Sequence, residues 1–264
     1  MHALIINGSP RVKKYSNTDK ILGKITEGMK ESGSSYEQFE ISDRSQWDTI
    51  RERFYVVDHI LIALPLYVEC IPGLLMEFLE TVEPIAKERL AEEASNGVAG
   101  SKKETSGTGS ASAGSAGEVS ASEFSGPVSA KSVSRPKLAF LLQSGFAEGI
   151  QLRCGEAYLE MLAGKLACEY AGTLVKGDNF SIRLFEDEQR EKIVGKYAEM
   201  GRIYGRDGAF TDEECKKFTG PEVFPLPIRL LVGLMFKTMA KKSFNDIAKK
   251  WGCTKPLTDR PYGK

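Results

Sequence analysis

The sequence predicts an α/β protein built on a doubly wound, mostly parallel sheet. Short apolar runs of strand length alternate along the chain with stretches in which apolar residues recur at helical spacing. Several of these runs are apolar throughout, as strands are when helices cover both faces of a sheet. Strands joined through helices pair in parallel with right-handed crossovers. A chain of 264 residues, 41% hydrophobic and 27% charged, can build such a core.

Five strands are expected, and four of them are buried runs. The second differs, because it alternates weakly and carries charged and polar residues that suit an outer position in the sheet. The expected strands cover residues 4–6, 35–41, 59–64, 137–142 and 170–175.

Helices are expected after each strand, from the spacing of apolar residues. Residues 17–31 carry Ile21, Leu22, Ile25 and Met29 at helical intervals. Pro72 suits the first turn of a helix that follows the third strand. The other expected helices cover residues 47–57, a stretch through Tyr158 to Leu166, and one continuous segment, 187–204.

Two segments stand apart from this alternation. From about residue 93 to 135 the composition becomes glycine, serine and alanine, which cannot bury enough surface to offset chain entropy, so we expect a disordered insertion. We therefore expect one domain over residues 1–210, interrupted at 93–135, and a C-terminal extension over 211–264.

The extension contains an amphipathic helix with an apolar stripe and nearby basic residues. Ile228, Leu231, Val232, Met235, Phe236 and Met239 form the stripe, with Arg229, Lys237, Lys241 and Lys242 elsewhere on the helix. Such a helix packs on its own domain or on a partner subunit, or it lies on an anionic membrane surface. Charges interrupt it well short of the ~20 apolar residues that a membrane span needs.

Charge and cysteine content narrow the function classes. Lys plus Arg equals Asp plus Glu at 36 each, so no global field recruits nucleic acid. Five scattered cysteines contain no C-x-x-C pair, and we predict reduced thiols and no metal or iron–sulfur site. No basic region with an apolar signal core precedes the first strand, so a cytoplasmic location is expected.

The stretch from Leu4 to Thr18 has the composition of a phosphate loop. A buried strand breaks into Asn7-Gly8-Ser9-Pro10-Arg11 and then reaches Ser16-Asn17-Thr18, where a helix begins. The first amides of a helix lack intrahelical partners and lie at the positive end of its dipole, so they favour an anion. The alternative is an ordinary turn with a helix cap at Ser16 or Asn17.

Three loops are expected at one edge of the sheet. They span residues 8–18, 65–71 and 143–151, after strands one, three and four. In an open parallel sheet, ligands bind at the carboxyl ends of the strands where the strand order reverses. Tyr67 and Phe146 follow strand ends directly, and we expect them to contact a planar ring rather than the core. Gly145 would let backbone amides approach the polar edge of that ring.

These three loops resemble those of the flavodoxin-like NAD(P)H-dependent FMN reductase and oxidoreductase family. The motifs are Asn7-Gly8-Ser9-Pro10-Arg11 with Ser16-Asn17-Thr18, Pro65-Leu66-Tyr67 with Ile71-Pro72-Gly73, and Ser144-Gly145-Phe146-x-Glu148. The resemblance covers about residues 1–90 and 137–204, and it implies a five-stranded parallel sheet of order 2-1-3-4-5. Relatives often have proline where Ala147 stands, and the insertion has no counterpart in compact members.

The resemblance also implies the cofactor and its ligands. FMN would place its phosphate on Ser9, Arg11, Ser16, Asn17 and Thr18. Pro65, Leu66, Tyr67 and Val68 would border the isoalloxazine ring, and Ser144, Gly145, Phe146 and Glu148 would lie along its other edge. The sequence assigns no catalytic side chain, because hydride transfer to a flavin needs positioning more than proton shuttling.

The expected function is an oxidoreductase that takes hydride from NADH or NADPH onto FMN and reduces a small acceptor such as a quinone or nitro compound. The family resemblance implies a homodimer. Two alternatives are a flavodoxin-type electron carrier, which the balanced charge disfavours, and a binding module with partner or membrane contacts through the C-terminal helix.

Overall fold

The computed structural model describes residues 1–100, 134–183, 185 and 187–260. The chain divides into two compact units, Met1–Gly220 and Pro221–Lys264. The sequence placed this boundary at residue 210. It lies farther along because helix α7 (Glu213–Thr219) contacts strand β5 (Glu169–Lys176) and so belongs to the first unit.

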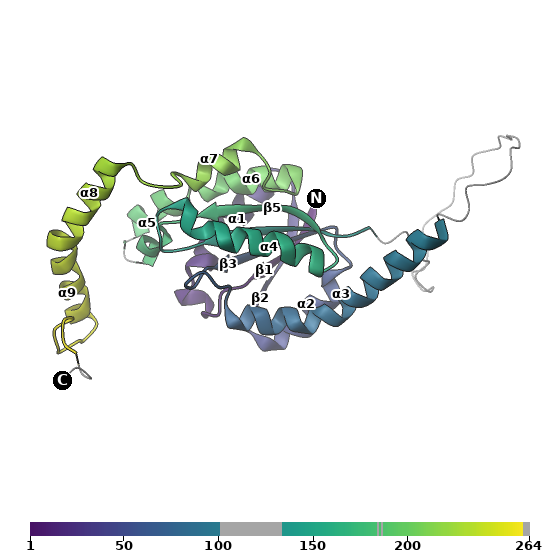
Figure 1. Cartoon of the computed structure of the whole chain (residues 1–264), viewed down its shortest axis with the longest axis horizontal. Coiled ribbons are helices and arrows are strands. Elements are labelled where there is room, and N and C mark those ends of the chain that lie inside the picture. Colours follow the sequence, from purple (N-terminus) through teal and green to yellow (C-terminus); the bar gives the residue numbers. More distant parts are fainter. Residues whose placement is uncertain (101–133, 184, 186, 261–264) are drawn as a thin grey trace, which may run out of the picture. The chain divides into compact units, whose positions relative to one another are not determined.

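The first unit contains a five-stranded sheet in which every neighbouring pair is parallel, in the order β2-β1-β3-β4-β5 (Figure 1). This confirms the predicted fold class and strand order, and β2 is an edge strand as its polar residues indicated. The strands are β1 (His2–Asn7), β2 (Ser35–Glu40), β3 (His59–Pro65), β4 (Lys137–Gln143) and β5 (Glu169–Lys176).

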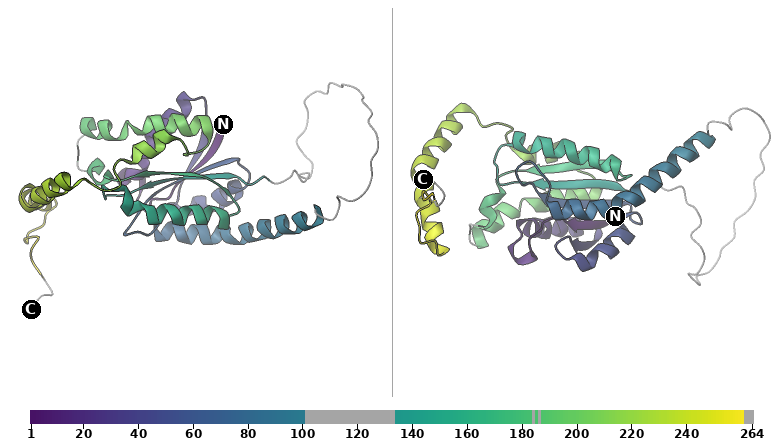
Figure 2. Two further views of the ribbon diagram at one scale, coloured as in Figure 1. Left: turned by 45° about the horizontal axis from the view of Figure 1, so that its top comes forward. Right: turned by 60° about the horizontal axis from the view of Figure 1, so that its bottom comes forward.

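Helices cover both faces of the sheet (Figures 1 and 2). Leu4 and Ile6 pack with α2, α3 and α4 on one face, whereas Ala3 and Ile5 pack with α1, α5, α6 and α7 on the other. The central strands are therefore buried on both sides, which explains their continuous apolar runs. The remaining helices of this unit are α1 (Asn17–Glu31), α2 (Trp47–Phe54), α3 (Gly73–Gly100), α4 (Arg153–Lys165), α5 (Asp187–Val194) and α6 (Tyr197–Asp207).

Two expectations about these elements are wrong. The segment 187–204 is two helices, because Gly195 interrupts it: the Ala198 amide donates to the Gly195 carbonyl at 3.1 Å, a bond to the third residue back that tightens the turn. The expected disordered segment also starts too early, since α3 continues through residues 93–100. Of the rest of that segment, residues 101–133 lie outside the described residues.

Helices α1 and α6 approach each other through glycines. A Cβ atom on Gly28 would lie 1.9 Å from the Ala198 carbonyl oxygen, and one on Gly201 would lie 2.1 Å from that of Ile25. The two backbones therefore touch where any side chain would separate them. This contact fixes α1, whose first turn lies at the carboxyl edge of the sheet.

The second unit contains α8 (Leu226–Met235), a π-helical turn (Phe236–Ala240) and α9 (Lys241–Lys250). Within the described part of the chain, no helix is long and apolar enough to cross a membrane.

Candidate functional site

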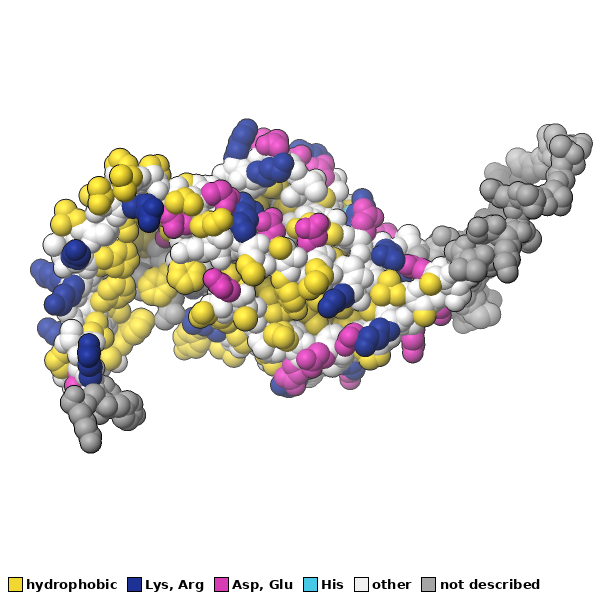
Figure 3. Space-filling model, viewed as in Figure 1, with side chains coloured by type: hydrophobic (Ala, Val, Ile, Leu, Met, Phe, Trp, Pro, Cys, Tyr) yellow, Lys and Arg dark blue, Asp and Glu magenta, His cyan; other side chains and the backbone are white. Residues whose placement is uncertain are grey.

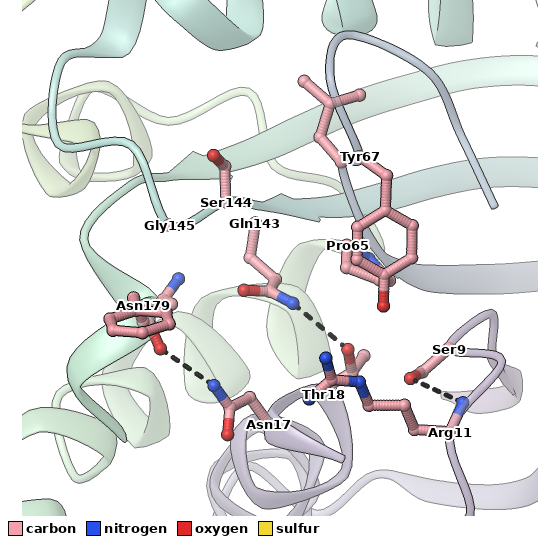
Figure 4. A pocket seen from close by; sticks show the side chains of 12 residues that line it. Ser9, Arg11, Asn17, Thr18, Pro65, Tyr67, Gln143, Ser144, Gly145 and Asn179 are labelled. Carbon is pink, nitrogen blue, oxygen red and sulfur yellow. Dashed lines mark hydrogen bonds between the residues drawn. The ribbon is translucent and has the colours of Figure 1, made fainter. Parts of the chain in front are cut away.

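The strand order reverses at β1, since the chain moves from β1 outward to β2 and then returns to β3 on the other side. Ligand sites in open parallel sheets form at such a point, outside the carboxyl ends of the strands. The loops after β1, β3, β4 and β5 meet there (Figure 4). Three of these four loops were predicted to converge.

The first loop leaves β1 through Gly8, whose amide donates to the Ala63 carbonyl at 2.7 Å. A Cβ atom here would lie 2.9 Å from Leu75 Cδ2 and 3.2 Å from the Ala63 oxygen, so the turn needs glycine. The Asn7 side chain accepts from the Ser9 amide at 3.1 Å, and the Ser9 hydroxyl accepts from the Arg11 amide at 3.3 Å. These bonds hold Ser9, which is buried, at the edge of the sheet.

Helix α1 begins next to this loop. Ser16 is its N-cap, and its hydroxyl accepts from the Asp19 amide at 3.2 Å. The amides of Asn17 and Thr18 lie in the first turn, where helix geometry offers no intrahelical acceptor. Thr18 also contacts β4, because the Gln143 side-chain amide donates to its hydroxyl at 3.3 Å.

Asn17 connects α1 to the segment after β5. Its Nδ2 donates to the Asn179 carbonyl at 2.9 Å, while its Oδ1 is buried without a hydrogen-bond partner among the described residues. The side chain of Asn179 is itself held by two hydrogen bonds. Its Oδ1 accepts from the Tyr197 hydroxyl at 3.1 Å, and its Nδ2 donates to the Lys176 carbonyl at 3.1 Å. An unpaired buried oxygen beside an open pocket is a place where a ligand hydroxyl can donate.

The second loop, after β3, contains a strained turn. Tyr67 and Cys70 exchange two backbone hydrogen bonds of 2.9 and 3.1 Å, and between them Val68 and Glu69 have φ angles of 49° and 68°. This is the geometry of a type I′ turn, which glycine and asparagine usually occupy. A β-branched residue in the left-handed region is an outlier, and such strain is concentrated at functional sites.

The loops after β4 and β5 are bonded to each other. The Asn179 amide donates to the Ser144 carbonyl at 3.0 Å, and the Asp178 amide donates to the Phe146 carbonyl at 2.7 Å. Within the first of these loops, the Phe146 amide donates to the Ser144 hydroxyl at 2.9 Å. A Cβ atom on Gly177 would lie 2.2 Å from the Phe146 oxygen, so this contact also depends on a glycine.

A pocket opens between these loops, which we call the edge pocket (Figure 4). It encloses about 540 Å³ of space, a volume that includes open solvent. Among its described lining residues, Arg11 carries the only formal charge, so the pocket suits an anion. The lining is Ser9, Arg11, Asn17, Thr18, Pro65, Leu66, Tyr67, Gln143, Ser144, Gly145, Asn179 and Phe180.

An outer hollow adjoins the edge pocket and is mostly apolar. It is lined by Leu66, Tyr67, Val68, Ser144, Gly145, Phe146 and Phe180. Tyr67 and Phe146 keep 41% and 49% of their surface exposed. Neither is therefore a core residue, and both are available to a ligand in the outer hollow.

Eleven of the thirteen predicted site residues therefore line one hollow or the other, and two do not. Ser16 is fully buried as the helix cap, and Glu148 lines neither hollow. The sequence missed Gln143, Asn179 and Phe180. Asn179 and Phe180 follow the fifth strand, and the rule that placed three strand ends at this edge also places the fifth there.

Burial shifts the pKa values of carboxylates close to the site. Desolvation raises the pKa of Asp19, against the opposing effect of its ion pair with Lys13 at 3.7 Å. Desolvation likewise raises the pKa of Glu40, whose carboxylate accepts from the Asn7 side chain at 2.6 Å. Neither lines the edge pocket, so no carboxylate opposes an anion there.

Neither a protein-family model nor a curated protein matches the sequence. Solved structures do match. A flavone reductase aligns with a TM-score of 0.52 and 16% identity over 78% of this chain and 64% of its own. An NADPH-quinone reductase from P. pentosaceus aligns with a TM-score of 0.45, 13% identity and coverage of 76% and 98%. An FMN-dependent NADH-azoreductase from Bacillus anthracis in complex with FMN aligns with a TM-score of 0.44, 13% identity and coverage of 78% and 100%.

The class of fold follows from the strand order together with the first of these likenesses. The chain has the flavodoxin-like fold. It spans 64% of the length of the flavone reductase.

Proposed function

We propose that this chain binds FMN in the edge pocket and uses it as an NAD(P)H-dependent oxidoreductase that reduces a small acceptor. The observation that carries the proposal is the convergence of four strand-end loops on one pocket beside the N-terminus of α1. One end of this pocket is polar and cationic, and the other opens into an apolar, aromatic hollow.

The described residues fit the parts of FMN. The amides of Asn17 and Thr18, the Ser9 and Thr18 hydroxyls and the Arg11 guanidinium provide donors for a phosphate. The buried Asn17 Oδ1, which lacks a protein donor among the described residues, suits a hydroxyl of the ribityl chain. Tyr67, Phe146 and Phe180 offer aromatic surface to a planar ring in the outer hollow.

Bound FMN would supply the chemistry of accepting a hydride and returning electrons to an acceptor. The chain would hold and orient it. The Ser144 and Phe146 amides donate within the protein, which leaves the Gly145 amide to donate toward the polar edge of the ring, and a preorganised donor of this kind stabilises developing negative charge. The exposed faces of Tyr67 and Phe146 leave room for the nicotinamide and then the acceptor to stack.

The first test is the flavin spectrum of the purified full chain. We expect a yellow protein, or a colourless one that quenches FMN fluorescence on titration and bleaches anaerobically with NADH or NADPH. Arg11→Ala should weaken FMN binding by about tenfold or more, the loss of one charge-assisted bond. Lys14→Ala removes an exposed cation of the same loop that does not line the pocket, and it should leave the affinity unchanged. A protein that takes up no FMN contradicts the proposal.

One observation favours a second candidate, a flavodoxin-type electron carrier. The chain is neutral overall, but the second unit carries 9 Lys and Arg against 3 Asp and Glu, so residues 1–220 carry 27 against 33 and a net charge of −6. An acidic domain can dock on a basic partner. Steady-state NAD(P)H oxidation by the isolated protein separates the two functions, because a carrier oxidises NAD(P)H only through a partner reductase.

A further inference from the structure

The C-terminal unit, Pro221–Lys264, has almost no core of its own. Among its described residues, Ala248 is the only buried hydrophobic side chain. Large apolar side chains of α8 are exposed instead, with Leu226, Leu230 and Leu234 at 66%, 67% and 60%. Figure 3 shows apolar side chains along this unit with lysines and arginines beside them. Surfaces of this kind mark an interaction site.

The apolar surface of α8 covers a wide arc of the helix. At about 100° per residue, Leu230, Leu234, Leu231 and Met235 follow one another around the helix over an arc of about 140°. Val232 extends that arc by a further ~60°. A helix that packs on a protein core needs an apolar stripe of only ~100° or more. An apolar face of this kind can also lie buried at the headgroup–acyl boundary of a membrane.

Helix α9 has a narrower apolar face than α8. Phe244, Ile247 and Trp251 lie at intervals of three and four residues on one face, and Phe244 and Trp251 are 42% and 62% exposed. The rest of the circumference carries four lysines, Asp246, and the uncharged residues Ser243, Asn245 and Ala248. The helix ends at Lys250, and Gly252, two residues beyond, has a φ of 81° that lets the chain turn away beside Trp251.

The net charge of the C-terminal unit indicates what kind of partner covers the apolar faces of α8 and α9. From residue 226 to 250 there are six basic residues and one acid, Asp246, and the whole unit has a net charge of +6. Lysine stems can lie along apolar surface while their ammonium groups reach the headgroup level. Aromatic side chains beside lysines are typical of helices at a membrane interface. No helix of the described chain can span a bilayer, so such a contact would be peripheral.

We propose that the C-terminal unit binds the surface of an anionic membrane. The apolar arc of α8 and the Phe244–Trp251 face of α9 lie at the acyl boundary, and the lysines contact anionic headgroups. This inference does not depend on flavin binding, since it concerns a different unit of the chain.

Sedimentation of the full chain with sucrose-loaded vesicles tests the proposal. We expect binding to phosphatidylcholine vesicles that contain phosphatidylglycerol, with a partition coefficient about tenfold or more above that for pure phosphatidylcholine. Binding should weaken strongly in high salt. The double variant Lys249→Glu/Lys250→Glu should lose most of it. The matched control Lys216→Glu/Lys217→Glu reverses two lysines of α7 and should bind nearly as the unchanged protein does.

Tryptophan fluorescence provides a second readout on the same protein. The chain has two tryptophans, and Trp47 is buried at 7% exposure while Trp251 is exposed. Anionic vesicles should therefore shift the emission to the blue through Trp251, and Trp251→Phe should abolish that shift. Absence of binding, equal binding to neutral vesicles, or a blue shift that depends on protein concentration without lipid would each overturn the proposal. The last outcome would indicate that a second copy covers these helices.

Discussion

The Asn17 side chain donates to the Asn179 carbonyl at 2.9 Å and so joins the first turn of α1 to a segment 162 residues later. This bond closes the edge pocket between α1 and the loop after β5. Both residues line the edge pocket, so the bond holds two of its walls together.

Asn17→Ala should weaken FMN binding and lower the stability of the fold by a similar, modest free energy. We expect about a tenfold loss of affinity by fluorescence titration and a loss of about 0.5–1.5 kcal/mol in unfolding free energy, as for one hydrogen bond. Ser181→Ala is the control, because it removes a nearby exposed hydroxyl that donates to the Asp178 carbonyl at 3.1 Å. If both variants bind FMN equally well, Asn17 is not a ligand.

The glycine contact between α1 and α6 gives a prediction about stability. Gly201→Ala should lower the free energy of unfolding by about 1–3 kcal/mol or more, because its Cβ would overlap the Ile25 carbonyl at 2.1 Å. Gly23→Ala on α1 meets nothing within 4 Å and should stabilise the protein by about 0.5–1 kcal/mol. Urea unfolding measures both, and opposite signs are expected.

Val68→Gly should stabilise the protein. Its φ of 49° costs a β-branched residue about 1–2 kcal/mol, and Val68→Gly removes this strain but adds chain entropy to the unfolded state. A net gain of up to about 1 kcal/mol is expected in urea unfolding. If the strain shapes the site, the same variant will also have an altered affinity for the acceptor, measured as KM. A loss of stability would show that the turn is relaxed as it stands.

Stability should fall in mild acid because of His59. Burial first, and then Lys137, lower the pKa of this histidine below 6.5, so the unfolded chain binds the proton more readily than the folded one. The stability that neutral His59 contributes is therefore complete above pH 6.5. It is lost as the pH falls through the lowered pKa of His59 in the folded protein. Urea midpoints at pH 7.5 and 5.5 should differ less in His59→Gln than in the unchanged chain. Equal differences would contradict this account.

The sequence predicted the sheet well, because its signals are strong and local. Continuous apolar runs of strand length that end at a turn signal, such as residues 59–64 before Pro65, favour buried strands, and their alternation with helices favours a parallel sheet. The break at Gly195 was missed, since apolar spacing continues across it and only the tightened turn reveals the interruption. The edge pocket was predicted in part for a similar reason. Ser9 and Thr18 follow a recognisable glycine turn, whereas Gln143 and Asn179 acquire their roles only through contacts distant in the sequence.

Strands β3 and β4 are neighbours in the sheet, with Ala63 opposite Leu141, although residues 66–136 lie between them in the chain. During synthesis, β1, β2 and β3 leave the ribosome well before β4. Until then, the edge of β3 from Ile60 to Leu64 presents unpaired amides and carbonyls on an apolar strand. An unpaired strand edge of this kind can pair with a strand of another chain, and so it promotes aggregation. A chain truncated anywhere within 101–133 would keep that edge permanently open, so fragments intended to isolate the N-terminal half should be extended through Lys176.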